Sequence, residues 1–277
     1  MISMIESYGL FEKNRSYWSQ RSVSYSDVNK EELSGESRHR WSAVLYEAIR
    51  SHFPGRPTGD ISVLDVGTGP GFFAILLAEM GYKVTAVDLT PEMLAEARVN
   101  AGDLANKIDF REMSAERLEF PDSSFDVVVS RNLTWNLPHP ETVYSEWCRV
   151  LHAGGLLLNF DSNWYNYLFD DVAKEKFEAD RLKSAELGLG DQNIGENFDV
   201  MEDIARNLPL STLARPVWDD AVLSQFGMKV RISTDIWKKV WTIQEQTNFS
   251  STPMFMITAV KKYSKPLPAD TYYYSNI

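Results

Sequence analysis

One stretch of the chain, residues 61–81, constrains the fold more than any other. It begins with a run of apolar residues, passes through glycines at positions 67, 69 and 71, and ends in an apolar segment closed by Gly81. The first part predicts a short buried strand, and the last part predicts a buried helix with glycine just beyond its C-terminus. The backbone N–H groups of such a turn lie beside the carboxyl end of a strand, where open α/β sheets bind ligands.

The spacing of the glycines narrows the class of ligand. The dinucleotide-binding fingerprint is G-x-G-x-x-G, whose glycines let a pyrophosphate approach the backbone. Here the third glycine, Gly71, comes one residue early, and Asp65 stands two residues before the first glycine. A carboxylate that points into this loop would repel a pyrophosphate and attract an ammonium group. In the alternative interpretation, Asp65 only caps the turn that follows it.

A second acidic residue stands at the end of the next predicted strand. Residues 83–89 have the composition of that strand, and Asp88 lies at its carboxyl end. A carboxylate at this position can accept hydrogen bonds from both hydroxyl groups of a ribose. The pocket is therefore expected to bind a ligand that has a ribose and an amino-acid group but no phosphates.

With these motifs, the sequence resembles the class I S-adenosylmethionine-dependent methyltransferases of the small-molecule type, similar to methyltransferase domains 11 and 25. Asp65 to Gly71 resembles their motif I, and Asp88 resembles their acidic motif II. The resemblance implies a Rossmann-like α/β fold with a seven-stranded sheet in the order 3-2-1-4-5-7-6, in which strand 7 is antiparallel. It also implies transfer of a methyl group to N, O, S or C of a small molecule by in-line displacement (EC 2.1.1.-), with S-adenosyl-L-homocysteine as product.

Two other functions stay open at this point. One is a cofactor-binding sensor or partner subunit that has the methyltransferase fold but no transferase activity. The other is an NAD-dependent oxidoreductase, which the early third glycine disfavours.

The resemblance also implies which residues contact the cofactor. Its ammonium group is expected against Asp65 and the Gly67 backbone, and its ribose against Asp88. Leu89 and Met93 are expected to pack on one face of its adenine. The full set of expected cofactor contacts is Tyr25, Asp65, Gly67, Thr68, Gly69, Gly71, Phe72, Asp88, Leu89, Met93, Ser114, Ala115, Glu116, Arg131 and Asn132.

Catalytic and acceptor-binding residues are expected beyond the ends of the later strands. If the acceptor must lose a proton, Asp161, His139 and Tyr25 are candidate general bases, although the position of His139 between two prolines also fits a plain loop residue. Some of the candidate acceptor contacts also have a purely structural interpretation. Trp18 would then pack the cap and Trp135 the lid, and Arg215 would be a surface or ion-pair residue. The candidate acceptor contacts are Trp18, Trp135, Trp164 and Arg215.

Composition bears on which partners are expected. The 277 residues carry a formal net charge of −11, so phosphate backbones would repel the chain and nucleic acid is not expected. The longest apolar run is too short to cross a bilayer and no signal-peptide pattern opens the sequence, so no membrane partner is expected. Cys148 is the single cysteine, which favours a reducing, cytoplasmic compartment. No metal-ligand cluster occurs at a useful spacing, so no metal site is expected.

The chain divides into four expected parts. Residues 1–55 form an aromatic-rich N-terminal helical cap, and residues 56–160 form the cofactor-binding core of alternating strands and helices. Residues 161–215 lack a strand pattern and are expected to be an inserted lid, and residues 216–277 complete the core sheet. We expect the cap and the insert to close together over the acceptor. In the alternative, the insert is the interface of a homodimer.

Overall fold

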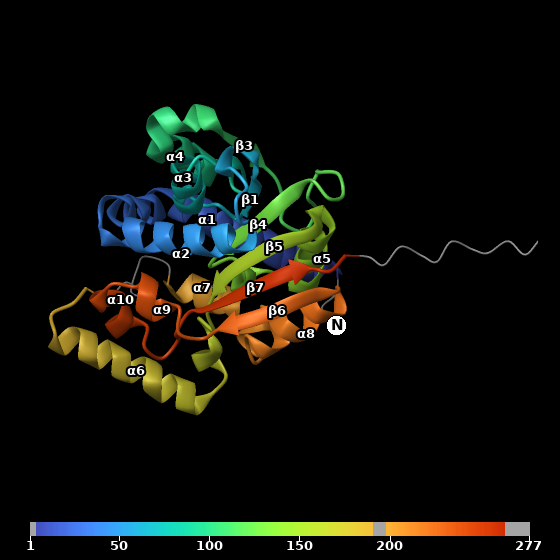
Figure 1. The fold of residues 1–277 in the computed structure, drawn as a ribbon. Coiled ribbons are helices and arrows are strands. Elements are labelled where there is room, and N and C mark those ends of the chain that lie inside the picture. The colour runs from blue at the N-terminus through green and yellow to red at the C-terminus, as the bar shows by residue number, and fades with distance from the viewer. Residues whose placement is uncertain (1–3, 191–197, 264–277) are drawn as a thin grey trace, which may run out of the picture.

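The structure is a computed structural model that describes residues 4–190 and 198–263. Its centre is a single seven-stranded sheet (Figure 1). The strand order is β3-β2-β1-β4-β5-β7-β6, which confirms the predicted order. Strand β7 runs antiparallel to both of its neighbours, also as predicted. The strands are β1 (Ser62–Val66), β2 (Lys83–Asp88), β3 (Ile108–Glu112), β4 (Phe125–Arg131), β5 (Leu151–Asp161), β6 (Met228–Ser233) and β7 (Phe255–Lys261).

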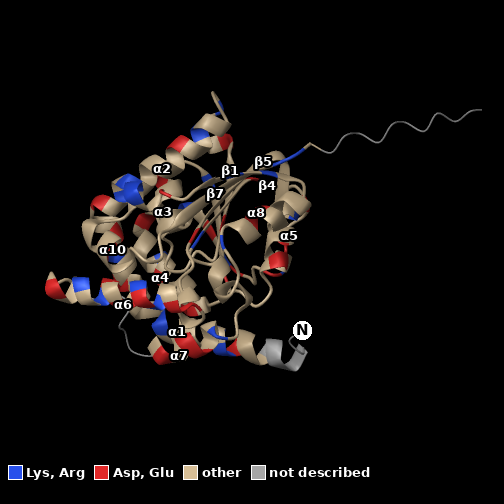
Figure 2. Cartoon of the chain, turned by 90° about the horizontal axis from the view of Figure 1, so that it is seen from below, with Lys and Arg blue, Asp and Glu red and all other residues tan. Residues whose placement is uncertain are grey.

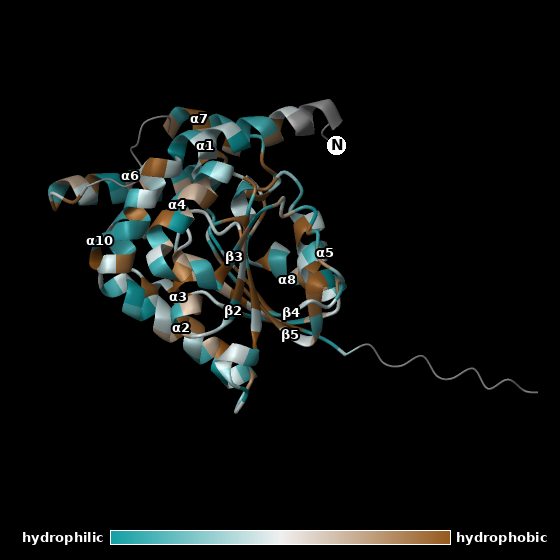
Figure 3. Ribbon diagram, turned by 90° about the horizontal axis from the view of Figure 1, so that it is seen from above, coloured by the Kyte–Doolittle hydropathy of each residue, from teal (hydrophilic) through white to brown (hydrophobic). Residues whose placement is uncertain are grey.

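Helices cover both faces of this sheet, with α2, α3 and α4 on one side and α5 and α8 on the other (Figure 3). The described helices are α1 (Met4–Ser34), α2 (Glu36–His52), α3 (Phe72–Glu79), α4 (Pro91–Ala101), α5 (Pro140–Val150), α6 (Asp171–Glu186), α7 (Phe198–Ala205), α8 (Val217–Gln225), α9 (Trp237–Val240) and α10 (Ile243–Asn248). Within the described chain, no helix is both long enough and apolar enough to cross a membrane.

The core consists of one apolar layer on each face of the sheet. On one face, Trp41 of α2 packs edge-on against Phe73 of α3 and Phe160 of β5, with ring centroids 5.1 Å apart in both pairs. On the other face, Tyr144 and Trp147 of α5 are fully buried. Strand β4 is buried from Phe125 to Ser130, as expected for a parallel strand covered on both sides. These layers hold the parallel strands in register and their carboxyl ends at one edge.

The cap and the insert gather at one end of the strands. Helix α1, which contains most of the predicted cap, lies there beside α7, with α6 close by (Figures 2 and 3). The charged helix expected in the insert is α6, and Figure 2 shows basic and acidic residues alternating along it. Apart from Asp161, which ends β5, the described residues of the insert form helices and loops and no strand. The site is therefore found where α1 and the insert meet the strand ends.

Candidate active site

The loop after β1 is shaped by its three glycines. Gly67, Gly69 and Gly71 all have positive φ angles, of 67°, 53° and 92°. A side chain at Gly67 would begin 2.7 Å from Leu133, so this position has no room for one. At Gly69, the nearest atom to an added Cβ belongs to Tyr25, at 3.7 Å, because this glycine faces an open cleft. The loop thus presents bare backbone to the cleft, as the sequence predicts.

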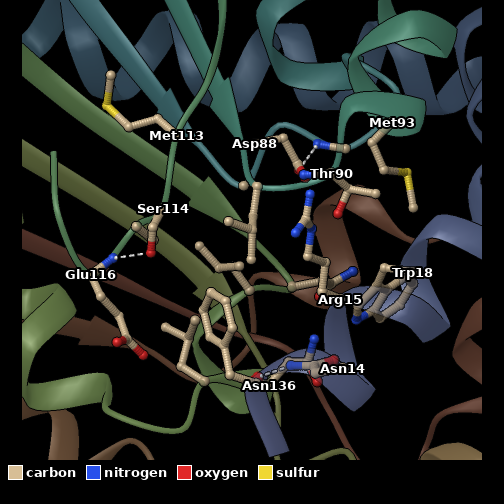
Figure 4. A pocket seen from close by; sticks show the side chains of 18 of the residues that line it. Asn14, Arg15, Trp18, Asp88, Thr90, Met93, Met113, Ser114, Glu116 and Asn136 are labelled. Atoms are coloured by element: carbon tan, nitrogen blue, oxygen red, sulfur yellow. Dashed lines mark hydrogen bonds between the residues drawn. The ribbon is translucent and has the colours of Figure 1, made fainter. Parts of the chain in front are cut away.

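The cleft lies between the carboxyl ends of the strands and helix α1, where ligand sites in open α/β sheets are found. Figure 4 shows side chains that enter it from α1, from the loop after β2 and from the loop after β3. Eleven of the expected cofactor contacts line it: Tyr25, Gly67, Gly69, Asp88, Leu89, Met93, Ser114, Ala115, Glu116, Arg131 and Asn132. Three others, Asp65, Thr68 and Phe72, line a small side cavity beside it.

Asp88 is held rigidly at the base of the cleft. Its Oδ2 accepts a hydrogen bond from the Gly69 N–H, and its Oδ1 accepts one from the Thr90 N–H (Figure 4), both at 2.9 Å. Burial raises the pKa of Asp88 above its ordinary value, and these backbone hydrogen bonds work against that rise. Each carboxylate oxygen keeps a second lone pair. Asp88 can therefore accept two further hydrogen bonds from a diol, as the ribose prediction requires.

Asp65 lies deeper, under the glycine loop, and only 2% of it is exposed. Its Oδ2 accepts a hydrogen bond from the Thr68 hydroxyl at 2.6 Å, and the Ala74 N–H also donates to this carboxylate. Burial raises the pKa of Asp65 to about 7. These contacts are the ones that the turn-capping alternative requires. Asp65 also lines the side cavity, so a ligand ammonium there would lie near its carboxylate.

Arg131 has a partner that the sequence did not indicate. At the end of β4, its two terminal nitrogens donate to the carboxylate of Glu32 on α1, at 2.7 and 2.9 Å. The guanidinium also lies 4.3 Å from the centre of the Phe72 ring. Both charged side chains are nearly buried, with 11% and 13% exposure. This ion pair ties the cap to the core and occupies part of the hydrogen-bonding capacity of Arg131, which is one of the expected cofactor contacts.

The opposite end of the cleft is largely apolar. Leu89, Met93 and Met113 line it, and the Ser114 hydroxyl accepts a hydrogen bond from the Glu116 N–H at 3.2 Å (Figure 4). An apolar slot with backbone groups at its edge suits a flat heterocycle such as adenine. The residues therefore fit S-adenosylmethionine: an apolar slot, a diol-binding acid in the middle and an acid beside a bare backbone loop at the far end.

Helix α1 contributes cleft residues that the sequence analysis missed. Phe11, Asn14 and Arg15 line the cleft together with Trp18 and Tyr25. The Asn14 amide donates to the carbonyl of Asn136 at 2.7 Å (Figure 4), which fixes α1 to the loop after β4. Their spacing of three, four and seven residues puts them on one helix face. That periodicity is a signal that could have found them.

A second cavity, the aromatic pocket, opens beside the cleft and encloses about 660 Å³. It shares Trp18, Tyr25 and Asn132 with the cleft. Its lining comes from α1, the loop after β4, the insert and the loop after α10, and consists of Trp18, Tyr25, Asn132, Trp135, Trp164, Tyr165, Tyr167, Phe177, Phe198 and Phe249. Three of the four predicted acceptor contacts are therefore brought together here.

The structure does not support Asp161 as a general base or Arg215 as an acceptor contact. Both side chains are fully buried, and Arg215 pairs with Asp161 and with Asp219, at 2.8 Å in each case. Asp161 also accepts a hydrogen bond from the Trp135 N–H at 2.9 Å. Neither residue lines the cleft or the aromatic pocket. Because buried charges must be paired, Asp161 does not fit a general base, and Arg215 has the ion-pair role that was its alternative.

The other candidate bases have different surroundings. The His139 ring is about half exposed, and its Nδ1 lies 3.0 Å from a carboxylate oxygen of Glu116. It lines neither the cleft nor the aromatic pocket, although Pro138 next to it lines the cleft. Tyr25 lines both, and burial raises the pKa of its hydroxyl. At neutral pH Tyr25 is thus a hydrogen-bond donor or acceptor and not a strong base.

Comparison with known proteins gives a family match in the same region. Residues 64–159 match the methyltransferase domain family. The ubiquinone/menaquinone biosynthesis C-methyltransferase of Methylobacterium nodulans is 37% identical over 136 residues, 48% of this chain and 52% of that protein. The phosphatidylethanolamine N-methyltransferase of Cereibacter sphaeroides is 40% identical over 95 residues, 34% of this chain and 46% of that protein. The chain thus matches about half the length of these relatives.

Solved structures agree on the fold. A methyltransferase of Haloferax volcanii, solved in complex with the Trm112 activator, has a TM-score of 0.57 and 16% identity and covers 90% of this chain and 99% of its own. A SAM-dependent methyltransferase of Aquifex aeolicus has a TM-score of 0.52 and 20% identity and covers 83% of this chain and 96% of its own. Residues 64–159 therefore match the methyltransferase domain family, and the sheet that contains them has the fold of these solved methyltransferases.

Proposed function

We propose that this protein transfers a methyl group from S-adenosylmethionine to a small-molecule acceptor. One observation carries the proposal: a cleft with a backbone-held acid, Asp88, adjoins a separate aromatic pocket with which it shares lining residues. Such a pair of cavities can bind the cofactor and the acceptor at the same time, one in each cavity. The similarity to enzymes named as C- and N-methyltransferases supports the reaction class and leaves the accepting atom open.

In this proposal, the cleft residues bind and orient the cofactor. Asp88 accepts hydrogen bonds from the ribose, while Leu89 and Met93 pack against the adenine. Asp65 and the Gly67 backbone lie near the ammonium group. Precise placement of two reactants can supply roughly 7–11 kcal/mol of a reaction barrier, so orientation by these groups would be the main catalytic contribution.

When bound, S-adenosylmethionine would supply an activated methyl group on a sulfonium for transfer to a lone pair of the acceptor, with neutral S-adenosylhomocysteine as the leaving group. Trp18 and Tyr25 lie at the junction of the two cavities, where their rings exclude water from the reacting atoms. Asp161 and His139 line neither cavity. In this proposal the methylated product of an O–H or N–H acceptor keeps that proton until it leaves the pocket, and it then gives the proton to bulk water.

Calorimetry with S-adenosylhomocysteine tests the first half of the proposal, and consumption of labelled S-adenosylmethionine in a small-molecule extract tests the second. Binding together with transfer into a small molecule is the expected result. Binding without consumption would favour a sensor or partner subunit. A thermal-shift comparison with NAD tests the oxidoreductase alternative, since a ligand at 100 times its Kd stabilises the protein by about 2.7 kcal/mol. Stabilisation by NAD alone would overturn the proposal.

We also propose that the cap and the insert form one lid. Both contribute rings to the aromatic pocket, Trp18 and Tyr25 from the cap and Trp164, Tyr165 and Tyr167 from the insert. Hydrogen exchange in residues 10–30, 161–190 and 198–215 should slow when S-adenosylhomocysteine binds, because a closed lid protects its amides. If exchange there responds only to protein concentration, the homodimer-interface alternative is correct.

A further inference from the structure

We propose that the aromatic pocket binds an uncharged, planar aromatic acceptor that carries a hydroxyl or N–H group. This inference rests on the proposed function, because it takes the neighbouring cleft as the cofactor site. It goes further by giving the chemical class of the acceptor. Three features of the pocket carry it: the ring-rich lining, the absence of charge from that lining, and an unpartnered acceptor atom at the junction with the cleft.

The lining of the aromatic pocket consists almost entirely of rings, since nine of its ten residues are Phe, Tyr or Trp. Several of these rings lie against their neighbours at intermediate angles. Trp135 and Tyr165 are tilted by 33° with centroids 5.1 Å apart, and Tyr165 and Tyr167 by 35° at 5.9 Å. Trp18 stands edge-on to Trp135 at 6.5 Å. A flat aromatic molecule can make both stacked and edge contacts with such a set of rings, whereas a saturated one loses them.

The described lining of this pocket contains no charged side chain. Burial raises the pKa of both Tyr25 and Tyr165, so their hydroxyls are neutral at physiological pH. The nearby Glu202 already accepts a hydrogen bond from Tyr167 at 2.7 Å. Arg215, one of the candidate acceptor contacts, already pairs with two buried carboxylates. An anion would therefore lose its hydration without a counter-charge in the described lining, because Arg21 and Arg131, whose charges act on Tyr25, are not part of that lining.

A cationic acceptor is also disfavoured, although ring faces attract cations. A protonated amine has no lone pair with which to attack a methyl carbon. In addition, the adjoining cleft would hold a sulfonium, which repels another positive charge in a water-poor site. An uncharged acceptor avoids both problems.

Asn132 supplies a polar contact at the junction of the two cavities, since it lines both. It follows β4 directly and has a positive φ of 56°, which is rare for residues other than glycine and is often found at functional sites. The side-chain amide of Asn132 donates to the Tyr25 hydroxyl, whereas its Oδ1 is buried and has no hydrogen-bond partner in the parts of the chain that the structure describes. An acceptor O–H or N–H that donates to this oxygen would lie next to the cofactor cleft.

The test compares four bicyclic probes by calorimetry on the protein saturated with S-adenosylhomocysteine. They are 2-naphthol, its saturated analogue 2-decalol, the anion 2-naphthoate and the cation 2-naphthylmethylammonium. We expect 2-naphthol to bind at least tenfold more tightly than 2-decalol and 2-naphthoate. The cation should not become methylated when S-adenosylmethionine replaces S-adenosylhomocysteine. Equal or tighter binding of 2-decalol or 2-naphthoate, or no binding of 2-naphthol, would overturn the inference. Because S-adenosylhomocysteine binding is measured first, failure of the proposed function is seen separately.

A matched pair of variants assigns the binding to this pocket. Tyr165 lines the aromatic pocket and not the cleft. Tyr165→Leu removes a ring and should weaken 2-naphthol at least tenfold, whereas Tyr165→Phe keeps the ring and should bind it normally. Both variants should bind S-adenosylhomocysteine as the wild type does, which also reports that they fold. If Tyr165→Leu folds and binds 2-naphthol unchanged, the probe lies elsewhere and the inference is wrong; if it does not fold, the probe series on the wild type decides.

Discussion

The cofactor cleft and the aromatic pocket adjoin each other, yet they recognise ligands by different physical means. In the cleft, backbone N–H groups of Gly69 and Thr90 hold one carboxylate in place, on loops anchored to a buried sheet. In the aromatic pocket, rings from the cap, the insert and two core loops surround a space with no charge in its described lining. Binding in the cleft should thus depend on a few rigid groups, and binding in the pocket on many partly replaceable contacts. Single substitutions can test this difference.

The largest effect is expected from Gly69→Val. This residue has a φ of 53°, its N–H donates to Asp88, and its missing side chain leaves the cleft open towards Tyr25. A valine would strain the loop and fill the space that the cofactor needs. Calorimetry should detect no S-adenosylhomocysteine binding, while circular dichroism shows an intact fold.

Gly55→Val is the matched control for strain. Gly55 has a φ of 78° and no atom within 4 Å of an added Cβ, and it does not line the cleft. It should carry a similar conformational penalty and bind S-adenosylhomocysteine normally. Normal binding by Gly69→Val would mean that the loop is structural only.

The next largest effect is expected on stability, from Arg215→Met. Arg215 compensates Asp161, which in turn accepts the Trp135 N–H and so supports the wall of the aromatic pocket. Removing one partner of a buried ion pair typically destabilises a protein by about 3–5 kcal/mol. Urea unfolding measures this change. Arg111→Met is the control, because its pair with Asp109 is half exposed and should contribute less than about 1 kcal/mol. Similar losses in both variants would contradict the structural role of Arg215.

The two regions also differ in how far the sequence predicts them. The alternation of strands and helices, the glycine loop and Asp88 could be predicted because each depends on contiguous residues with a regular pattern. The order of the strands in the sheet could be predicted only through the resemblance to a known family. The pairs Arg131–Glu32 and Arg215–Asp161 join residues that are 99 and 54 positions apart. No local pattern indicates such pairs, since tertiary packing alone brings them together. For this reason the sequence places Asp161 and Arg215 in the site, whereas in the structure they are buried and hold the wall of the aromatic pocket through Trp135.

Asp88→Ala should have a smaller but clear effect. A hydrogen bond to a charged group contributes roughly 1.5–3 kcal/mol, and a ribose would make two with this carboxylate. Affinity for S-adenosylhomocysteine should fall at least tenfold by calorimetry. Asp109→Ala removes an equal charge from an exposed position and should leave affinity unchanged. Equal affinity in the Asp88 variant would remove the ribose assignment.

The smallest effect expected in the cleft is a dependence of binding on pH through Asp65. Burial raises the pKa of this carboxyl to about 7 from an ordinary value of 3.8. Its neutral form therefore stabilises the unliganded fold below about pH 4, and this contribution is lost as the pH rises through 7. The affinity for the ligand should instead increase as the pH rises, because the ammonium group of the ligand prefers the ionised carboxylate.

With a pKa of about 7, Asp65 is about one tenth ionised at pH 6 and about nine tenths ionised at pH 8. If only the ionised form attracts the ligand ammonium, S-adenosylhomocysteine affinity should rise by up to about tenfold over this interval. Asp65→Asn keeps a hydrogen-bonding side chain under the loop but cannot ionise, so its affinity should not follow this rise. A wild-type affinity that stays constant from pH 6 to 8 would leave Asp65 as a cap of its turn. The ligand ammonium would then have to be held by backbone carbonyls of the glycine loop alone.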